Sequence, residues 1–371
     1  MYDVIVVGQG LSGLLSAIWA KQQGKRTALA AMGTGRIIQS SGVMDSIPGT
    51  QDWQGNPIQK GAIEAFKRLT EKMGYPYKGE IENPISIVTG AGHVKKTILY
   101  PATISPIPEQ GRVVIVGFDH ILDFQPTFVQ KNLQKARPTL MISTLTVQLR
   151  KHSQRTLTQL DAARLLDQSE VRNDCIRQIQ QQMYEKNISQ PDLFIFPASL
   201  GMEKWQETIE HFSTELNAKV TEAPGMPPNA TAIRLHERLK KEAVQLGVRF
   251  YENTVVFGCK LDGKIIDSLI IKNGSYESVI SGKEFILATG GILGGGLEQT
   301  SIGLKETALG FETNESGELL YCPSNLYPVG ASNGLRVIHH GITGGVYSIL
   351  SAHEAIAKIG KNPMMGGTRS A

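Results

Sequence analysis

Three glycines near the start of the chain, Gly8, Gly10 and Gly13, have the spacing of a loop that binds a phosphate. In such a loop the first glycine allows a tight turn, the second lets the backbone approach the ligand, and the third lets a helix and a strand pack closely. Leu11 and Ser12 begin the helix, where free backbone N–H groups and the helix dipole favour negative charge. We therefore predict that these five residues bind a phosphate or pyrophosphate.

The sequence on either side supplies the elements that such a loop requires. Residues 3–7 form an apolar run typical of a buried parallel strand, and residues 11–20 form a densely apolar helix. A second strand is expected over residues 27–31, where a dinucleotide fold usually carries an Asp or Glu that binds ribose hydroxyls. Ala31 and Met32 stand at that place. The chain therefore keeps the phosphate loop and lacks the ribose carboxylate.

Further turns rich in glycine and hydroxyl groups follow other predicted strands, and they are candidate cofactor contacts. They are Ser40, Ser41, Gly42, Thr289, Gly290, Gly330, Gly344 and Gly345. An open α/β sheet binds its ligand at the carboxyl ends of parallel strands, and a late helix opening at Gly344 would direct its positive end at a flavin ring. For Ser40 to Gly42 a plain Ser/Gly turn is the other interpretation. Two cofactors stay open: FAD held in another way, or FMN, which has no adenosine.

The chain of 371 residues is long enough for two lobes. We predict a first part of a flavin-binding domain over residues 1–75, an inserted α/β lobe over 76–226, and a second part of the flavin domain over 227–371. A proline-rich stretch at 224–228 marks the second boundary. Hairpin turns are expected at Asp262-Gly263 and at Asn273-Gly274. The predicted class is α/β, a Rossmann-like flavin-binding fold of the glutathione-reductase and fumarate-reductase kind with an inserted lobe.

Composition excludes several classes of protein. Charged residues make up 19% and the formal net charge of +4 is spread along the chain, so we expect no nucleic-acid partner. The chain has 3 cysteines, too few and too scattered for an iron–sulfur cluster or a disulfide framework, and no metal-ligand cluster is visible. No run of about twenty apolar residues occurs. We expect a cytoplasmic protein, or one held at a membrane by a partner.

Passages along nearly the whole chain resemble the B subunits of anaerobic glycerol-3-phosphate dehydrogenases. The passages are Gly8–Gly13, Ser40-Ser41-Gly42 with Asp45, Val113–Gly117 through Asp123–Gln125, Pro197 and Gly201, Pro227-Pro228 with Ile233-Arg234-Leu235, the strand into Ala288, and Gly330 with Gly341, Gly344 and Gly345.

The resemblance implies a flavin subunit, usually credited with FMN, which is an oxidoreductase of glycerol metabolism and anaerobic respiration. It would work with an FAD-bearing A subunit and an iron–sulfur C subunit that ties the complex to the inner face of the cell membrane. The complex would oxidise sn-glycerol 3-phosphate to dihydroxyacetone phosphate and pass electrons towards quinone, with fumarate or nitrate as final acceptor.

Two departures weaken the case for a self-sufficient substrate site. The stretch from Gly296 to Phe311 is shorter than the resemblance implies, and the residue after Gly330 is Ala331 where many FAD enzymes have Asp. Two alternatives therefore stay open: a flavin electron-transfer or scaffold subunit without catalysis, and a free-standing FAD-dependent oxidoreductase of a hydroxy acid.

The catalytic residues are unknown, and three side chains are candidates. His339 and His340 precede the last glycine turn, and a histidine there could take the hydroxyl proton as hydride leaves for the flavin. Ordinary loop histidines are the alternative interpretation. Arg234 could hold a phosphate bidentately, or it could be a solvated arginine on a helix.

Overall fold

The computed structural model describes residues 1–45, 57–149, 156–301, 303–334 and 344–361. The chain divides into two compact units, described here one at a time. Unit 1 comprises residues 1–36, 47–69 and 238–371, and unit 2 comprises residues 37–46 and 70–237. Residues 37–46 and 227–237, which the predicted division places in the flavin domain, cluster with unit 2.

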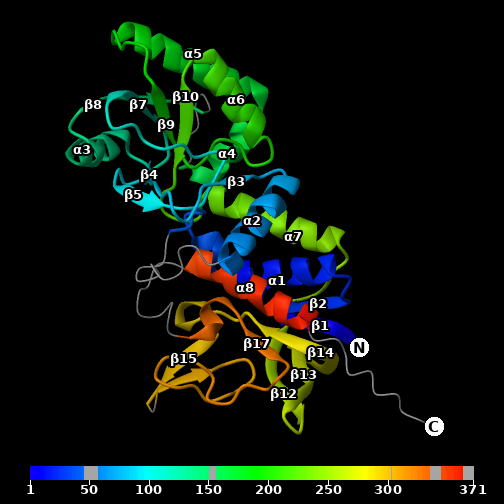
Figure 1. The fold of residues 1–371 in the computed structure, drawn as a ribbon. Helices are drawn as coiled ribbons and strands as arrows, with labels where there is room; N and C mark the ends of the chain where they lie inside the picture. The colour runs from blue at the N-terminus through cyan, green and yellow to red at the C-terminus, as the bar shows by residue number, and fades with distance from the viewer. Residues whose placement is uncertain (46–56, 150–155, 302, 335–343, 362–371) are drawn as a thin grey trace. The chain divides into compact units, whose positions relative to one another are not determined.

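Unit 1 is built on a 7-stranded sheet. Its strands are β1 (Tyr2–Val7), β2 (Thr27–Ala31), β11 (Arg249–Glu252), β12 (Val255–Asp262), β13 (Ile265–Asn273), β14 (Tyr276–Leu287) and β17 (Leu326–Pro328). The order is β11-β2-β1-β14-β13-β12, and β17 also pairs with β14. Strands from both ends of the chain therefore lie side by side, with β1 in blue next to β14 in yellow (Figure 1).

Two kinds of strand pairing meet in this sheet. The last part of β14 pairs in parallel with β1 and β17, and its first part pairs antiparallel with β13. The antiparallel strands turn at Gly263 and Gly274, which have φ values of +58° and +59°, so the two predicted hairpins are confirmed. The buried residues Val4 to Val7 explain why β1 reads as a continuous apolar run.

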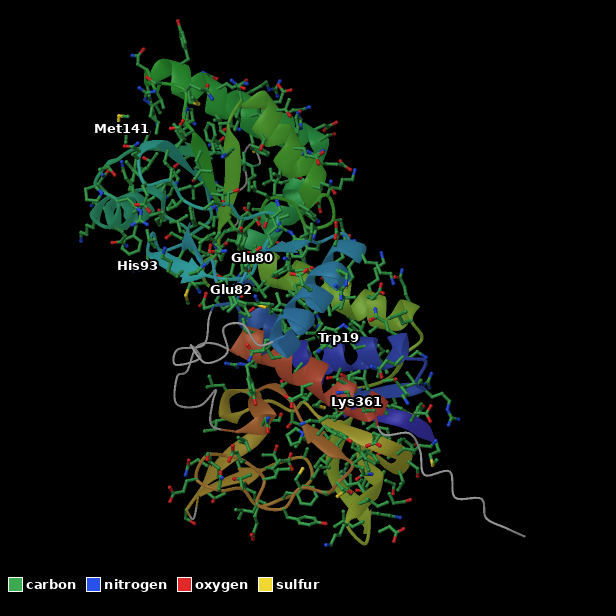
Figure 2. All side chains as sticks on the ribbon, viewed as in Figure 1. Trp19, Glu80, Glu82, His93, Met141 and Lys361 are labelled. Carbon is green, nitrogen blue, oxygen red and sulfur yellow. The ribbon has the colours of Figure 1, made fainter. Side chains whose placement is uncertain are left out.

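Helices complete unit 1. They are α1 (Leu11–Gln22), α8 (Gly344–Lys361), most of α2 (Pro57–Lys72), the later part of α7 (Ala230–Gln245), and the 3₁₀ turns η3 (Ile292–Gly294) and η4 (Gly330–Asn333). Helices α1 and α8 pack together, and the ring of Trp19, labelled in Figure 2, meets that of His353 edge-on at 5.3 Å. A hairpin of β15 (Leu297–Thr300) and β16 (Gly303–Glu306) follows η3.

Unit 2 holds a second, parallel sheet in the order β10-β9-β7-β8. Its elements are β7 (Gly111–Phe118), β8 (Leu140–Val147), β9 (Leu193–Pro197), β10 (Lys219–Ala223), α3 (Pro126–Ala136), α4 (Gln159–Leu166), α5 (Ser169–Glu185) and α6 (Trp205–Glu215). Two small pairs of strands precede them, β3 (Tyr77–Lys78) with β6 (Tyr100–Pro101), and β4 (Ile85–Val88) with β5 (Val94–Thr97). The inserted segment therefore has an α/β core of its own.

Strand β8 lies at one end of this sheet, and glutamine side chains cover its outer backbone. Amides from α3 and α5 donate hydrogen bonds to four carbonyl oxygens on this side of the strand. The pairs are Gln134 to Leu140 (3.1 Å), Gln130 to Ile142 (2.6 Å), Gln182 to Thr146 (2.8 Å) and Gln178 to Gln148 (2.9 Å). Between them the side chain of Met141 is exposed (Figure 2).

Within the described residues, no helix combines the length and the apolar character that a bilayer span needs.

Candidate cofactor site

The parallel strands of unit 1 end together. Val7 lies beside Ala30 and Leu287, and Leu287 lies beside Pro328. The loops that follow β1, β2, β14 and β17 therefore share one edge of the sheet, which we call the carboxyl edge; the end of β11, on the far side of β2, is not counted in it. Its described residues are 8–10, 32–36, 288–296 and 329–334. This is the position at which an open α/β sheet binds a ligand.

The three glycines of the first loop occupy the positions that their predicted roles require. A Cβ atom on Gly8, at φ +103°, would collide with the carbonyl of Ala288, and one on Gly13 would collide with the carbonyl of Gly8. A Cβ atom on Gly10 would meet no atom of the described residues within 4 Å. Two glycines therefore allow tight packing, while the third leaves open space beside the backbone.

The start of α1 is free to receive an anion. Gly10 is its N-cap residue, no side chain in the described ranges caps the helix, and its first turn contains no acidic residue. The N–H groups of Leu11 and Ser12 have no acceptor within the helix, because the first four amides of any α-helix lack one. An anionic group in the space beside Gly10 would receive these donors and the positive end of the helix dipole.

A buried polar atom in the same loop also lacks a partner. Gln9 is only 5% exposed, and its side-chain oxygen has no hydrogen-bond donor among the described residues. A buried acceptor left unpaired costs about 1–3 kcal/mol. A ligand with hydroxyl or N–H donors would remove that cost. The open space at Gly10, the free amides and this acceptor together fit a flavin that carries a phosphate.

The loop after β14 is fixed to the turn after β17 by Ser332. Its hydroxyl accepts a hydrogen bond from the N–H of Gly290 at 2.7 Å and lies 3.2 Å from the hydroxyl of Thr289. Ser332 is absent from the predicted site, and the signal that could have found it is its place just after a strand-end glycine. Its contacts hold two predicted cofactor residues at the carboxyl edge.

Gly330 lies against the first turn of α1. A Cβ atom there would be 2.7 Å from the hydroxyl oxygen of Ser12, and its N–H donates to Ser351 of α8 at 2.8 Å. The structure therefore brings together the predicted residues after β1, β14 and β17. Gly344 and Gly345 begin α8, as predicted. His339 and His340 lie outside the described residues.

Ser40, Ser41 and Gly42 belong to unit 2, where their backbone carbonyls are taken by other side chains. Asn229 donates to Ser40, Thr231 to Ser41 and Tyr77 to Gly42, at 3.0, 2.7 and 2.6 Å. These bonds make a well-anchored turn. Contact of these three residues with a cofactor stays a prediction.

Arg234 does not have the environment expected of a phosphate ligand. The residue is 1% exposed, and its guanidinium donates to both oxygens of Glu222, at 2.8 and 3.0 Å, and to the carbonyl of Gly201. Burial alone would lower its pKa, but Glu222 and Tyr75 hold the pKa above its ordinary value. The interpretations as a solvated arginine and as a phosphate ligand are both wrong, because the bidentate partner is a buried carboxylate.

Comparisons with known proteins give a family match and several named relatives. Residues 3–67 match the family described as FAD binding domain. The B subunit of the anaerobic glycerol-3-phosphate dehydrogenase of Vibrio cholerae is 24% identical over 351 residues, 85% of this chain and 79% of that protein. The protein of the same name from Yersinia enterocolitica is 23% identical over 383 residues, 92% of this chain and 89% of that protein.

Solved structures are more distant. A 3-ketosteroid delta1-dehydrogenase from Sterolibacterium denitrificans is 14% identical and covers 78% of this chain and 48% of its own, with a TM-score of 0.36. A flavocytochrome c3 fumarate reductase is 12% identical and covers 78% of this chain and 34% of its own, with a TM-score of 0.34.

The comparisons bear out the main predictions. The resemblance to the B subunits is confirmed, and so is the α/β flavin-binding fold class. The predicted enzyme class, a subunit of a flavin-dependent dehydrogenase, is confirmed as well, and the cofactor class is a flavin.

Proposed function

We propose that this chain is the flavin-binding B subunit of an anaerobic glycerol-3-phosphate dehydrogenase. The complex would oxidise sn-glycerol 3-phosphate to dihydroxyacetone phosphate and pass electrons towards quinone, with fumarate or nitrate as the final acceptor. The observation that carries the proposal is the extent of the similarity, because relatives of this name align with 80–92% of the chain. A carboxyl edge with bare amides supports the same conclusion.

FMN is the proposed cofactor. The end of β2 supports it, because Ala31 and Met32 offer no carboxylate to an adenosine ribose. When bound, the flavin supplies hydride acceptance. The chain would hold its phosphate with Gly8, Gly10, Leu11, Ser12 and Gly13. The remaining proposed contacts are Ser40, Ser41, Gly42, Thr289, Gly290, Gly330, Gly344 and Gly345. The proposed flavin domain comprises residues 1–75 and 227–371, with 76–226 as the inserted lobe.

The proposed partners are an FAD-bearing A subunit and an iron–sulfur C subunit that anchors the complex. The relatives are named as B subunits, which supports an enzyme of several different chains. The proposed location is the cytoplasm, at the inner face of the cell membrane through the C subunit.

One observation favours a second candidate, an electron-transfer or scaffold subunit without a substrate site. Oxidation of an alcohol needs a group that takes the hydroxyl proton. The described residues of the carboxyl edge include no Asp, Glu, His, Lys, Cys or Tyr. In this alternative the A subunit supplies the base and this chain only passes electrons.

Two measurements test these proposals. The flavin released from the purified chain by denaturation is identified by chromatography, and FMN is the expected result; FAD would overturn the mononucleotide proposal. The chain is then assayed for dye reduction with sn-glycerol 3-phosphate, alone and with its partner subunits. Turnover by the chain alone would exclude the scaffold candidate. Turnover of another hydroxy acid, with none of glycerol 3-phosphate, would overturn the proposed substrate.

A further inference from the structure

The carboxyl edge of unit 1 contains a single charged residue among its described positions, Arg36. The loops after β1, β14 and β17 consist there of glycine, uncharged polar and apolar residues. Arg36 ends the loop after β2 and begins the 3₁₀ turn η1 (Arg36–Gln39). It stands five residues beyond Ala31, in the loop whose first positions lack the expected ribose carboxylate.

Arg36 lies between the two loops that the flavin site requires. A Cβ atom on the preceding residue, Gly35, would be 2.7 Å from the Cα of Gly10, so the loop after β2 packs on the glycine loop. A Cβ atom on Gly294 would be 3.9 Å from the Cγ of Arg36, so the arginine stem runs beside the loop after β14. Arg36 therefore directly follows a residue that packs on the glycine loop before α1, and its side chain begins beside the loop after β14.

No protein anion neutralises this arginine among the described residues. Arg36 is exposed, and neither an ion pair nor a hydrogen bond joins its guanidinium to another described group. The nearby end of α1 carries the positive pole of the helix dipole and no acidic residue in its first turn. Two positive groups close together, without a carboxylate, favour an anion between them.

We infer that Arg36 binds the phosphate of the flavin, together with the N–H groups of Leu11 and Ser12. A guanidinium matches a phosphate with two parallel hydrogen bonds, and such charge-assisted bonds are stronger than neutral ones. The inference rests on the proposed flavin. It predicts that replacing this one side chain weakens the binding of phosphorylated flavins and leaves riboflavin binding unchanged.

The test titrates the full chain, freed of flavin, with riboflavin, FMN and FAD, and follows quenching of flavin fluorescence. Arg36→Gln is expected to weaken FMN binding about 10- to 100-fold, the usual value of a hydrogen bond to a charged group. Riboflavin binding should stay unchanged, because riboflavin lacks the phosphate. The FMN affinity of Arg36→Lys should lie between those of the wild type and Arg36→Gln, since lysine keeps the charge without the planar guanidinium.

Arg26→Gln is the matched control. Arg26 precedes β2 at the opposite edge of the sheet, and the substitution removes the same charge from the other end of the same strand. It should leave the ratio of FMN to riboflavin affinity unaltered. An unaltered ratio in Arg36→Gln would overturn the inference.

The outcomes also separate the inference from the proposed function. A chain that binds FMN tightly through Arg36 and does not support glycerol 3-phosphate oxidation with its partners would overturn only the proposed substrate. A wild-type chain that binds none of the three flavins would overturn both.

Discussion

Two arginines, one in each unit, lie beside glycine backbone in opposite surroundings. Arg234 in unit 2 is buried, and its guanidinium donates hydrogen bonds to Glu222 and to the carbonyl of Gly201. Arg36 in unit 1 is exposed, runs beside Gly294 and has no described carboxylate partner. The guanidinium of Arg234 is therefore already bonded within the protein, whereas that of Arg36 is available to a ligand.

The difference lies in the neighbours. In unit 2 the guanidinium of Arg234 is matched by protein partners, and burial raises the pKa of Tyr75 to about 12, so this phenol does not titrate near neutral pH. In unit 1 the buried side-chain oxygen of Gln9 and the first amides of α1 have no hydrogen-bond partner among the described residues. An arginine therefore indicates ligand binding only where no carboxylate of the protein already pairs with it.

The largest effect is expected when the buried ion pair of Arg234 and Glu222 is broken. Glu222→Gln leaves the buried charge of Arg234 without its counter-ion, and removal of one partner of such a pair costs about 3–5 kcal/mol. The free energy of unfolding in urea, followed by tryptophan fluorescence, measures it. Trp205 is a suitable reporter because its ring lies 5.4 Å from that of Tyr75.

A double variant provides the control. Replacing the pair by apolar residues, with Glu222→Leu and Arg234→Met, should recover part of the lost stability, because neither charge is then buried alone, whereas the N–H of Leu200 and the carbonyl of Gly201 lose their partners. A Glu222→Gln chain as stable as wild type would show that Arg234 does not depend on Glu222 for its charge. The contrast between the two arginines would then be wrong.

Two glycines of the first loop sharpen the description of the open site. Gly13→Ala places a Cβ against the carbonyl of Gly8 and should cost about 1–3 kcal/mol of stability, the usual cost of overpacking. The added methyl group of Gly10→Ala meets no atom of the described part of the chain within 4 Å, so stability should change by less than about 0.5 kcal/mol. Its methyl group would occupy the predicted phosphate space and should weaken FMN binding.

Thermal unfolding and flavin titration of both variants check this pair. Equal flavin affinity in Gly10→Ala and wild type would show that the phosphate does not approach the backbone at Gly10.

The smallest expected effect concerns Arg26, which is exposed like Arg36 but has a carboxylate partner like Arg234. Hydrogen bonds from Arg26 lower the pKa of Asp3 to about 2. The folded-state pKa lies below the unfolded value, so the stabilisation is present above about pH 4 and is lost as the pH falls towards 2. Because Arg26 is solvent-exposed, we expect about 1 kcal/mol. Asp3→Asn should flatten the dependence of unfolding free energy on pH in this range; an unchanged dependence would contradict the assignment.

Local sequence signals predicted the elements that depend on neighbouring residues. The spacing of Gly8, Gly10 and Gly13 predicted the loop, because the same three positions meet the strand, the ligand space and the helix. The dipeptides ending in Gly263 and Gly274 predicted the hairpins for a similar reason, since the left-handed backbone is a local requirement.

Properties that depend on distant residues were not visible. Arg234 follows Glu222 by twelve residues on a different element, and nothing in the spacing shows that β10 and α7 bring them together. The short segment 230–236 is rich in small and apolar residues, a sign that a charge there is enclosed. Arg36 carried a clearer signal, as the only charge at the described positions of four strand ends. Its proximity to Gly10 and Gly294 depends on loop packing, which the sequence does not show.

The glutamines along β8 have a consequence for assembly. An unpaired outer strand is a template on which another chain can add a strand, within a complex or in an aggregate. Four side-chain amides bond the carbonyls of Leu140, Ile142, Thr146 and Gln148, and the backbone N–H of Gln148 is bonded to Gln178 at 2.8 Å. A neighbouring protein would have to displace these amides before extending the sheet. These glutamines therefore hinder the addition of a strand at the two ends of β8.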